Sequence, residues 1–208
     1  DLERLLARLA SGSGNGRDVR ALALSLAKLP ALQAALAPHT TGRLAELNRA
    51  IVPQDDLVAL IQRALVDEPP ISIKEGGLIR KGYHEQLDEL RAAAHDGKQW
   101  IAALQAQEIE RTGISSLKIR FNKVFGYFIE VTKANLSRVP SDYIRKQTMV
   151  NGERFITPEL KEVESKIVGA EEKSVALEYE LFLELREQVV AATPEIQQTA
   201  AAIAELDV

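Results

Sequence analysis

The sequence predicts a mainly α-helical protein with one small antiparallel β domain inserted into it. Two observations favour this class. Alanine- and leucine-rich segments with helical spacing fill both ends of the 208-residue chain, whereas β-branched and aromatic residues concentrate between residues 114 and 157. Long predicted helices flank this middle segment, so they must run antiparallel and carry the β domain at their far end. The predicted parts are a helical part at 1–113, a β-rich part at 114–157 and a returning helical part at 158–208.

The first helical part begins with short elements. We expect a helix over residues 1–10 and a flexible Ser/Gly/Asn loop at 11–16. Asp18 is a candidate cap for the next helix, and prolines interrupt the helical pattern before residue 50. A further helix begins at Asp55 and ends before Pro69. Acidic residues are favoured in the first turn of any helix, so the acids at its start do not indicate a metal site.

Two longer elements complete the helical frame. Residues 71–82 predict a tight two-stranded turn with two glycines at its tip, and a long helix follows to Arg111. After the β segment, Thr157 and Pro158 are typical of a helix start, and apolar spacing then marks a helix of about thirty residues. Thr193 and Pro194 repeat the same start signal before a last helix that ends near residue 206.

The β segment shows the period of two that is typical of strands. Apolar residues at 117, 119 and 121 alternate with polar residues at 118, 120 and 122, and the alternation resumes after the Phe125-Gly126 turn. A third run starts at Tyr143, and Asn151-Gly152 is a strong hairpin signal. We expect three or four short antiparallel strands.

Charge separates this segment from the rest of the chain. Residues 114–157 hold eight basic and three acidic residues, a net charge of +5, whereas the whole chain is −4. A basic sheet in an acidic helical body indicates an anionic partner at that place, although a merely solvated strand face would have the same composition.

Composition excludes several other classes of function. The absence of cysteine rules out disulfides and thiolate sites, and three scattered histidines support neither a zinc site nor a catalytic triad. We therefore expect no enzyme activity, no metal site and no cofactor. No apolar run approaches the roughly 20 residues that span a bilayer, and no signal peptide opens the chain, so we expect a cytoplasmic protein without a membrane contact.

The segments FNKVFGYFIEVTKAN and VPSDYIRKQTMVNGERFITPELKE resemble the clamp of the MutS family of DNA mismatch-recognition proteins. The resemblance continues through GGLIRKGYHEQLDELR before the clamp and KIVGAEEKSVALEYELF after it. It implies a MutS fragment with a core and lever part at 1–113, a clamp at 114–157 and a returning lever and core part at 158–208.

The resemblance also implies a function. The family's clamp grips duplex DNA through its sugar-phosphate backbone, without sequence specificity, and its long helices link the clamp to an ATPase domain that is absent here. ATP, Mg²⁺, a second MutS subunit and a MutL-type repair partner belong to the parent protein. By this resemblance the contacting residues are, in the first rank, Asn122, Lys123, Lys146, Asn151 and Arg154, and in the second, Arg120 and Arg145.

One alternative from another class remains open. An antiparallel coiled coil whose terminal sheet binds a protein partner would have the same periodicity, and its basic residues would contribute nothing to DNA affinity. An RNA-binding sheet is weaker, because the paired aromatic motif of such sheets is not present.

Overall fold

The computed structural model describes residues 1–207, and these residues form two compact units. The helical unit comprises Asp1–Glu85 and the chain from Val175 on, and the sheet unit is the continuous segment Gln86–Ser174. The helix α7 (Pro158–Ala191) contributes its first half to the sheet unit and its second half to the helical unit.

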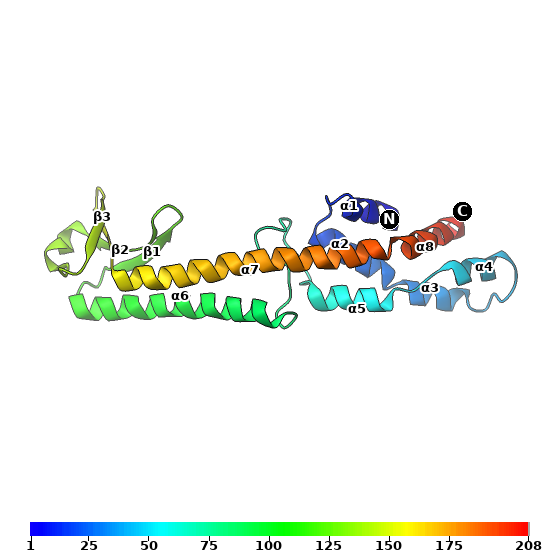
Figure 1. The fold of residues 1–208 in the computed structure, drawn as a ribbon, viewed down its shortest axis with the longest axis horizontal. Coiled ribbons are helices and arrows are strands. Elements are labelled where there is room, and N and C mark those ends of the chain that lie inside the picture. Colours follow the sequence, from blue (N-terminus) through cyan, green and yellow to red (C-terminus); the bar gives the residue numbers. More distant parts are fainter. Residues whose placement is uncertain (208) are drawn as a thin grey trace. The chain divides into compact units, whose positions relative to one another are not determined.

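The helical unit consists of short helices around an aliphatic core. Its elements are α1 (Leu2–Ala10), α2 (Gly16–Leu26), α3 (Leu29–Leu36), α4 (Gly42–Ala50), α5 (Asp55–Ala64), the end of α7, and α8 (Thr193–Leu206) (Figure 1). Leu22, Ile61 and Phe182 are completely buried in it. The cap of α2 is Asn15, and Asp18 is instead the third residue of the helix, where its carboxylate accepts the Asn15 N–H at 2.9 Å.

Residues 16–36 combine a length and a mean hydropathy, 1.3, that a membrane span could also have. They form two separate helices, α2 and α3, of 11 and 8 residues, and each is shorter than the roughly 20 residues that cross a bilayer. The apolar side of α2, including Val19 and Leu22, is buried, as expected for a core helix.

The two-stranded turn predicted at 71–82 is wrong. Only an isolated bridge forms there, between Ile79 and Leu65. The Glu178 carboxylate on α7 accepts the N–H groups of Leu78 and Ile79 at 2.7 and 3.1 Å, and the Val66 N–H donates to the Leu78 carbonyl at 3.0 Å. The segment therefore bonds to a helix side chain and to the end of α5, and no hairpin closes on itself.

The sheet unit contains α6 (Glu85–Thr112), four strands and the start of α7. The strands are β1 (Lys118–Asn122), β2 (Gly126–Thr132), β3 (Ile144–Thr148) and β4 (Gly152–Ile156), with a 3₁₀ helix, η1 (Lys133–Arg138), after β2. All neighbours are antiparallel, in the order β1-β2-β4-β3. The predicted class, mainly α with a small antiparallel sheet, is confirmed.

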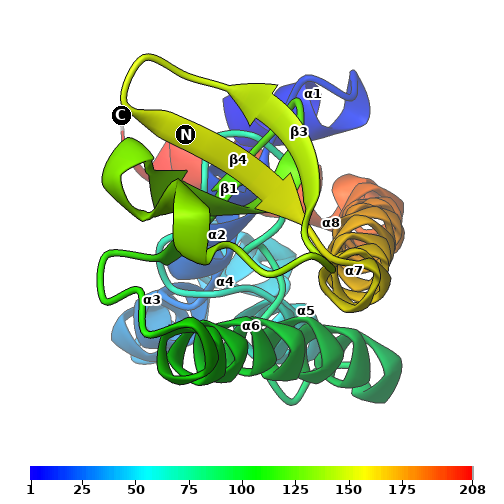
Figure 2. The same cartoon turned by 90° about the vertical axis from the view of Figure 1, so that its left-hand side faces the viewer.

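Within this unit α6 leads to the sheet and α7 leads away from it, and the two helices run antiparallel and side by side (Figures 1 and 2). Gly97 on α6 faces Ile167 on α7 so closely that an added Cβ would lie 2.4 Å from the Ile167 side chain. Lys98, next to Gly97, forms an ion pair with Glu171, which lies one helical turn beyond Ile167 on α7. The absence of a side chain at residue 97 therefore sets the closest approach of the two helices.

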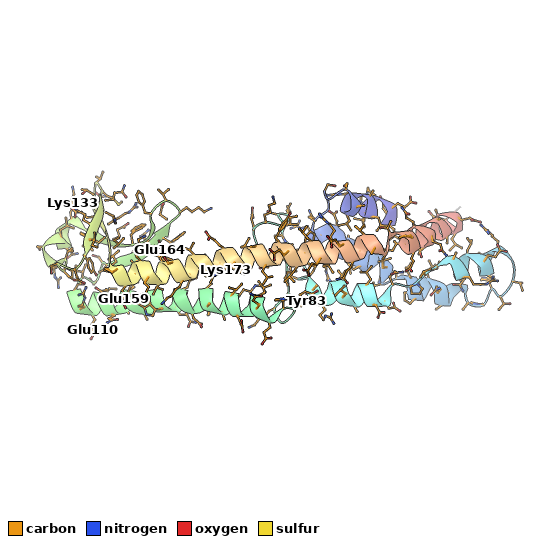
Figure 3. The ribbon with its side chains drawn as sticks, viewed as in Figure 1. Tyr83, Glu110, Lys133, Glu159, Glu164 and Lys173 are labelled. Carbon is orange, nitrogen blue, oxygen red and sulfur yellow. The ribbon has the colours of Figure 1, made fainter. Side chains whose placement is uncertain are left out.

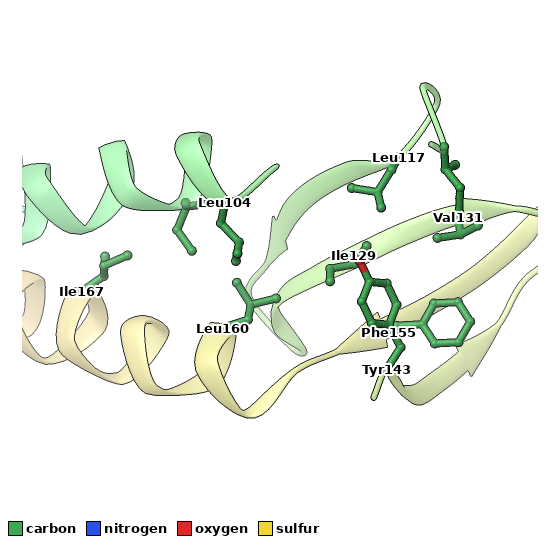
Figure 4. Close-up of a cluster of buried hydrophobic side chains, with 10 residues drawn as sticks. Leu104, Leu117, Ile129, Val131, Tyr143, Phe155, Leu160 and Ile167 are labelled. Carbon is green, nitrogen blue, oxygen red and sulfur yellow. The ribbon is translucent and has the colours of Figure 1, made fainter. Parts of the chain in front are cut away.

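One face of the sheet, which we call the inner face, packs on the ends of these helices (Figure 4). Ile129, Val131 and Phe155 supply it from β2 and β4, and Leu104 and Leu160 meet them from α6 and α7. Each is under one tenth exposed. Burying a side chain of this size stabilises the folded state by about 1.5–3 kcal/mol, so this cluster fixes the sheet on the helices.

The start of α7 also holds the β1–β2 hairpin. Gly126 has a φ of +71°, and an added Cβ would lie 2.2 Å from the Glu164 carboxylate. That carboxylate accepts the Tyr127 N–H at 2.6 Å and pairs with Lys161 at 2.9 Å. The hairpin therefore needs glycine here for two reasons, the backbone conformation and the space that the carboxylate takes.

A buried polar group joins β3 to the end of α6. The Tyr143 hydroxyl donates to Glu108 at 2.6 Å, and Arg111 binds the same carboxylate at 2.8 Å and Asp142 at 3.1 Å. Burial and then the neighbouring carboxylate raise the pKa of Tyr143 far above the usual value, and the Arg111 hydrogen bonds lower the pKa of Asp142. The buried Glu108 is thus held by two donors at neutral pH.

The two Thr-Pro helix starts behave differently. The Thr157 hydroxyl accepts the Leu160 N–H at 3.1 Å, so the expected cap of α7 is confirmed. Thr193 is wrong as a cap, because it is already the first residue of α8 and Ala192 occupies the cap position. The buried Thr193 hydroxyl has no hydrogen-bond partner among residues 1–207.

Replacing Gly126 by alanine is expected to destabilise the sheet unit by about 2.5–5 kcal/mol. The left-handed conformation costs a residue with a Cβ about 1–2 kcal/mol, and displacing Glu164 removes a charge-assisted hydrogen bond worth about 1.5–3 kcal/mol. Urea unfolding followed by the fluorescence of Trp100, which packs against the buried cluster, measures the change. Gly169→Ala is the control, because this glycine lies within α7 with open space around it, and the variant should gain about 0.5–1 kcal/mol. An unchanged Gly126→Ala variant would contradict the close approach.

Tyr143→Phe is expected to cost about 1.5–3 kcal/mol in the same measurement, because it leaves the buried Glu108 carboxylate without one of its donors. Tyr127→Phe is the matched control. Its hydroxyl has no hydrogen bond within residues 1–207, so its removal should change stability by less than about 0.5 kcal/mol. Equal effects of the two substitutions would show that the hydrogen bond to Glu108 is not the stabilising contact.

Candidate nucleic-acid interface

The strand register places cations on the face of the sheet that points away from the helices. We call this the outer face, defined by Lys118, Arg120, Phe128, Glu130 and Arg154. Lys118 lies opposite Glu130, which lies opposite Arg154, and Arg120 lies opposite Phe128. Because side chains alternate along a strand, burial of Ile129 and Phe155 on the inner face forces these neighbours outward.

Arg154 is held in a fixed position on the outer face. Its guanidinium lies over the Phe128 ring, 4.3 Å from the centroid, and donates to the Gln147 side-chain oxygen at 2.8 Å. Its Nε is 3.9 Å from Glu130, and the Arg120 Nε lies 3.9 Å from the same residue. One carboxylate is thus shared by two arginines, and the outer face keeps a net positive charge.

Most of the other cations of residues 114–157 have no carboxylate partner in the part of the chain that the structure describes. Within the described residues, no acidic oxygen lies within 4 Å of the charged groups of Lys118, Lys123, Lys133, Arg138 and Lys146. Arg145, on the edge strand β3, differs because it lies 3.4 Å from Glu153 on β4. Figure 3 shows Lys133 at the sheet and acidic residues such as Glu110 and Glu159 on the helices.

The two turns that carry predicted site residues lie at opposite ends of β2. Asn122 pairs with Gly126 at one end, and Gly152, next to Asn151, pairs with Thr132 at the other. At about 3.3 Å per residue the six steps of β2 separate the turns by roughly 20 Å. The Asn122 side-chain oxygen accepts the Val124 N–H at 2.8 Å and so shapes its own turn. The Asn151 backbone carbonyl accepts the Lys133 N–H at 3.1 Å, which joins the second turn to the start of η1.

The predicted site residues therefore lie in three places. Lys146 and Arg154 line one pocket together with residues of the β1–β2 turn, where Asn122 and Lys123 lie. Asn151 belongs to the other turn, and Arg120 and Arg145 lie on strands between the two ends. The strands thus bring Lys146 and Arg154 together beside the turn that carries Asn122 and Lys123, while Asn151 lies at the opposite end of β2.

Sequence reasoning missed three cations near these groups. Lys118 shares the outward register of Arg120, so the period of two could have identified it. Lys133 lies beside the second turn, where its N–H reaches the Asn151 carbonyl. Lys161 comes from α7, and its ammonium donates to the Phe125 carbonyl at 3.1 Å; no pattern in the sequence indicates that contact.

The described residues contain no group of three or more His, Cys, Asp or Glu side chains placed to hold a metal ion. The cations instead lie on a rigid antiparallel sheet with few acids near them. Positive charge on a rigid support suits contact with phosphate groups by charge and hydrogen bonding, which carries no base-sequence information.

Comparison with known proteins agrees with this geometry. The family model described as MutS family domain IV matches residues 82–173. The chain is 55% identical over 207 residues to the DNA mismatch repair protein MutS of Symbiobacterium thermophilum, 53% identical to that of Alkaliphilus oremlandii and 54% identical to that of Myxococcus xanthus. Each alignment covers 100% of this chain but only 23 or 24% of the relative, so the chain spans about a quarter of the length of these relatives. The resemblance noted in the sequence is confirmed, and the chain belongs to the MutS family, with its domain IV at residues 82–173.

Proposed function

We propose that this chain is the DNA-backbone-binding arm of a longer mismatch-repair protein. The proposal rests on the cations of the sheet and its turns that no carboxylate of residues 1–207 neutralises, Lys118, Lys123, Lys133, Arg138 and Lys146. Lys123 and Lys146 are the principal phosphate contacts, Arg154 and Asn151 assist them, and Asn122, Arg120 and Arg145 are secondary.

The physical chemistry of the sheet supports binding without sequence preference. Phosphate contacts need positive charge on a rigid support, and they release condensed counterions from DNA whatever the base sequence. The two turns, roughly 20 Å apart, reach separate stretches of backbone. Arg154 is already ordered by Phe128 and Gln147, so little side-chain entropy is lost when it meets a phosphate.

The rest of the function belongs to the whole protein. In this proposal the chain itself is not catalytic and binds no cofactor, and an ATPase domain that uses ATP and Mg²⁺ is coupled to it through α6 and α7. A second MutS subunit closes around the duplex, a MutL-type protein acts downstream, and the protein works in the cytoplasm. The continuous 34-residue α7 is suited to transmit such movement as a lever.

Fluorescence anisotropy of a labelled duplex, titrated with the 208-residue chain at several salt concentrations, tests the DNA contact. We expect equal affinity for paired and mismatched duplexes and a log–log salt slope of a few units, at about 0.9 per phosphate. The double variant Lys123→Gln, Lys146→Gln should weaken binding and reduce the slope by about 1.8.

Lys166→Gln is the matched control, because this exposed lysine lies on α7 and is paired with Glu162. It should leave the salt slope unchanged. An unchanged slope in the double variant would contradict the assignment of Lys123 and Lys146. DNA affinity that depends on no basic residue of the sheet would favour the protein-binding alternative.

The lever is tested in a longer protein that includes the ATPase. Val175→Pro, in the middle of α7, removes a helix hydrogen bond and should uncouple nucleotide binding from DNA release, measured as the ATP-dependent dissociation rate from a duplex. Val175→Ala keeps the helix and should keep the coupling. Unchanged coupling in the proline variant would overturn the lever.

A further inference from the structure

The sheet unit contains a pocket of about 240 Å³ with an apolar floor. Phe128 and Ile156 form this floor and are almost fully buried, while Val124 and Phe125 from the β1–β2 turn form its rim. Val124 is 80% exposed and Phe125 45% exposed. None of the four belongs to the buried cluster that holds the sheet on the helices, so the docking of the sheet does not explain them.

Three cations surround the apolar floor. Lys146 has no carboxylate within 4 Å in the described part of the chain, and Arg154 is held over the Phe128 ring. Lys161 is paired with Glu164 at 2.9 Å, and the other nearby acid, Glu130, is shared by Arg154 and Arg120. The rim is therefore positive, and it favours an acidic ligand.

The size of the pocket limits what enters it. Sites for drug-sized ligands measure about 300–1,000 Å³, whereas a cavity of about 150 Å³ accepts benzene. A pocket of 240 Å³ therefore suits one bulky apolar side chain. Duplex DNA is a poor occupant, because its outer surface consists of phosphates and its one apolar base group, the thymine methyl, lies within the major groove.

We propose that this pocket binds an acidic peptide segment of a partner protein and that one phenylalanine or similar side chain of the segment fills it. The carboxylates that flank this side chain pair with Lys146 and Arg154, and the ring contacts Phe125 and Phe128. The site does not depend on DNA binding. Since Lys146 and Arg154 also belong to the proposed phosphate contact, the peptide and the duplex compete for them.

The test uses a fluorescein-labelled nine-residue peptide with a central phenylalanine and four aspartates or glutamates on each side. A second peptide has alanine at the centre. Anisotropy titrations with the 208-residue chain compare the two. We expect the phenylalanine peptide to bind about tenfold or more tightly than the alanine peptide, since burial of an aromatic side chain contributes about 1.5–3 kcal/mol.

Two variants of the pocket have matched controls on the same sheet. Phe125→Ser removes the apolar rim and Lys146→Glu reverses the charge, and each should weaken the phenylalanine peptide by about tenfold. Ile144→Ser and Lys133→Glu change an exposed isoleucine and an unpaired lysine that do not line the pocket, and they should alter binding less than about twofold.

Equal binding of the two peptides would overturn the proposal, because charge alone would then explain the contact. No binding of the phenylalanine peptide at millimolar chain would overturn it as well. If Phe125→Ser weakens duplex binding but leaves peptide binding unchanged, the pocket belongs to the DNA contact and the proposal is wrong. If the chain binds the peptide but no duplex, the peptide site is supported and the proposed DNA function is wrong, so the two failures are distinguishable.

Discussion

Burial of the inner face of the sheet against α6 and α7 is the constraint on which the sheet unit depends. Ile129 and Phe155 are buried there against Leu160. A shift of one residue in the register of either strand would turn Ile129 or Phe155 to the solvent. The register is therefore fixed by the hydrophobic effect, and with it the direction of every neighbouring side chain. The outward position of Arg154 and Lys118 is a consequence of what is buried behind them.

The same constraint separates charge of opposite sign. Acids of the sheet unit lie mainly on α6 and α7, where Glu108 and Glu164 are already used to hold β3 and the β1–β2 hairpin. These carboxylates are taken up by structural contacts and leave the cations of the outer face largely unneutralised. The two turns are roughly 20 Å apart, more than the Debye length of about 8 Å at physiological salt, so each group of cations meets an anionic partner separately.

Apolar and basic groups meet at the end of the sheet that carries the β1–β2 turn. The Phe128 ring packs under the Arg154 guanidinium, and Phe125 extends the apolar surface to the β1–β2 turn beside Lys146. The proposed DNA contact and the proposed peptide contact share these cations and differ in their use of the apolar floor. In these proposals one surface binds two partners in turn. The cations contact both the duplex and the peptide, and the aromatic pocket contacts only the peptide.

Much of the fold was predictable because local patterns carry it. The period of two in the strands and the Thr157 cap depend on neighbouring residues only, and both appear in the structure. A hairpin also forms between β3 and β4, but the Met149 N–H bonds to the Gly152 carbonyl, so Val150 and Asn151 are at its tip and Gly152 already belongs to β4. The prediction at 71–82 failed because Glu178, a hundred positions away, takes the backbone N–H groups that a hairpin would need. Thr193 failed for a smaller reason, since the helix begins one residue earlier than its cap signal suggests.

Residue type and local spacing were enough to predict most helices and strands, the basic character of the sheet and the family. Tertiary structure decided which cations remain free. Arg145 and Arg154 look alike in the sequence, yet one pairs with Glu153 at the edge and the other lies over Phe128 in a pocket. These differences arise from contacts between strands and helices that are distant in the chain, and such contacts exist only after the inner face is buried.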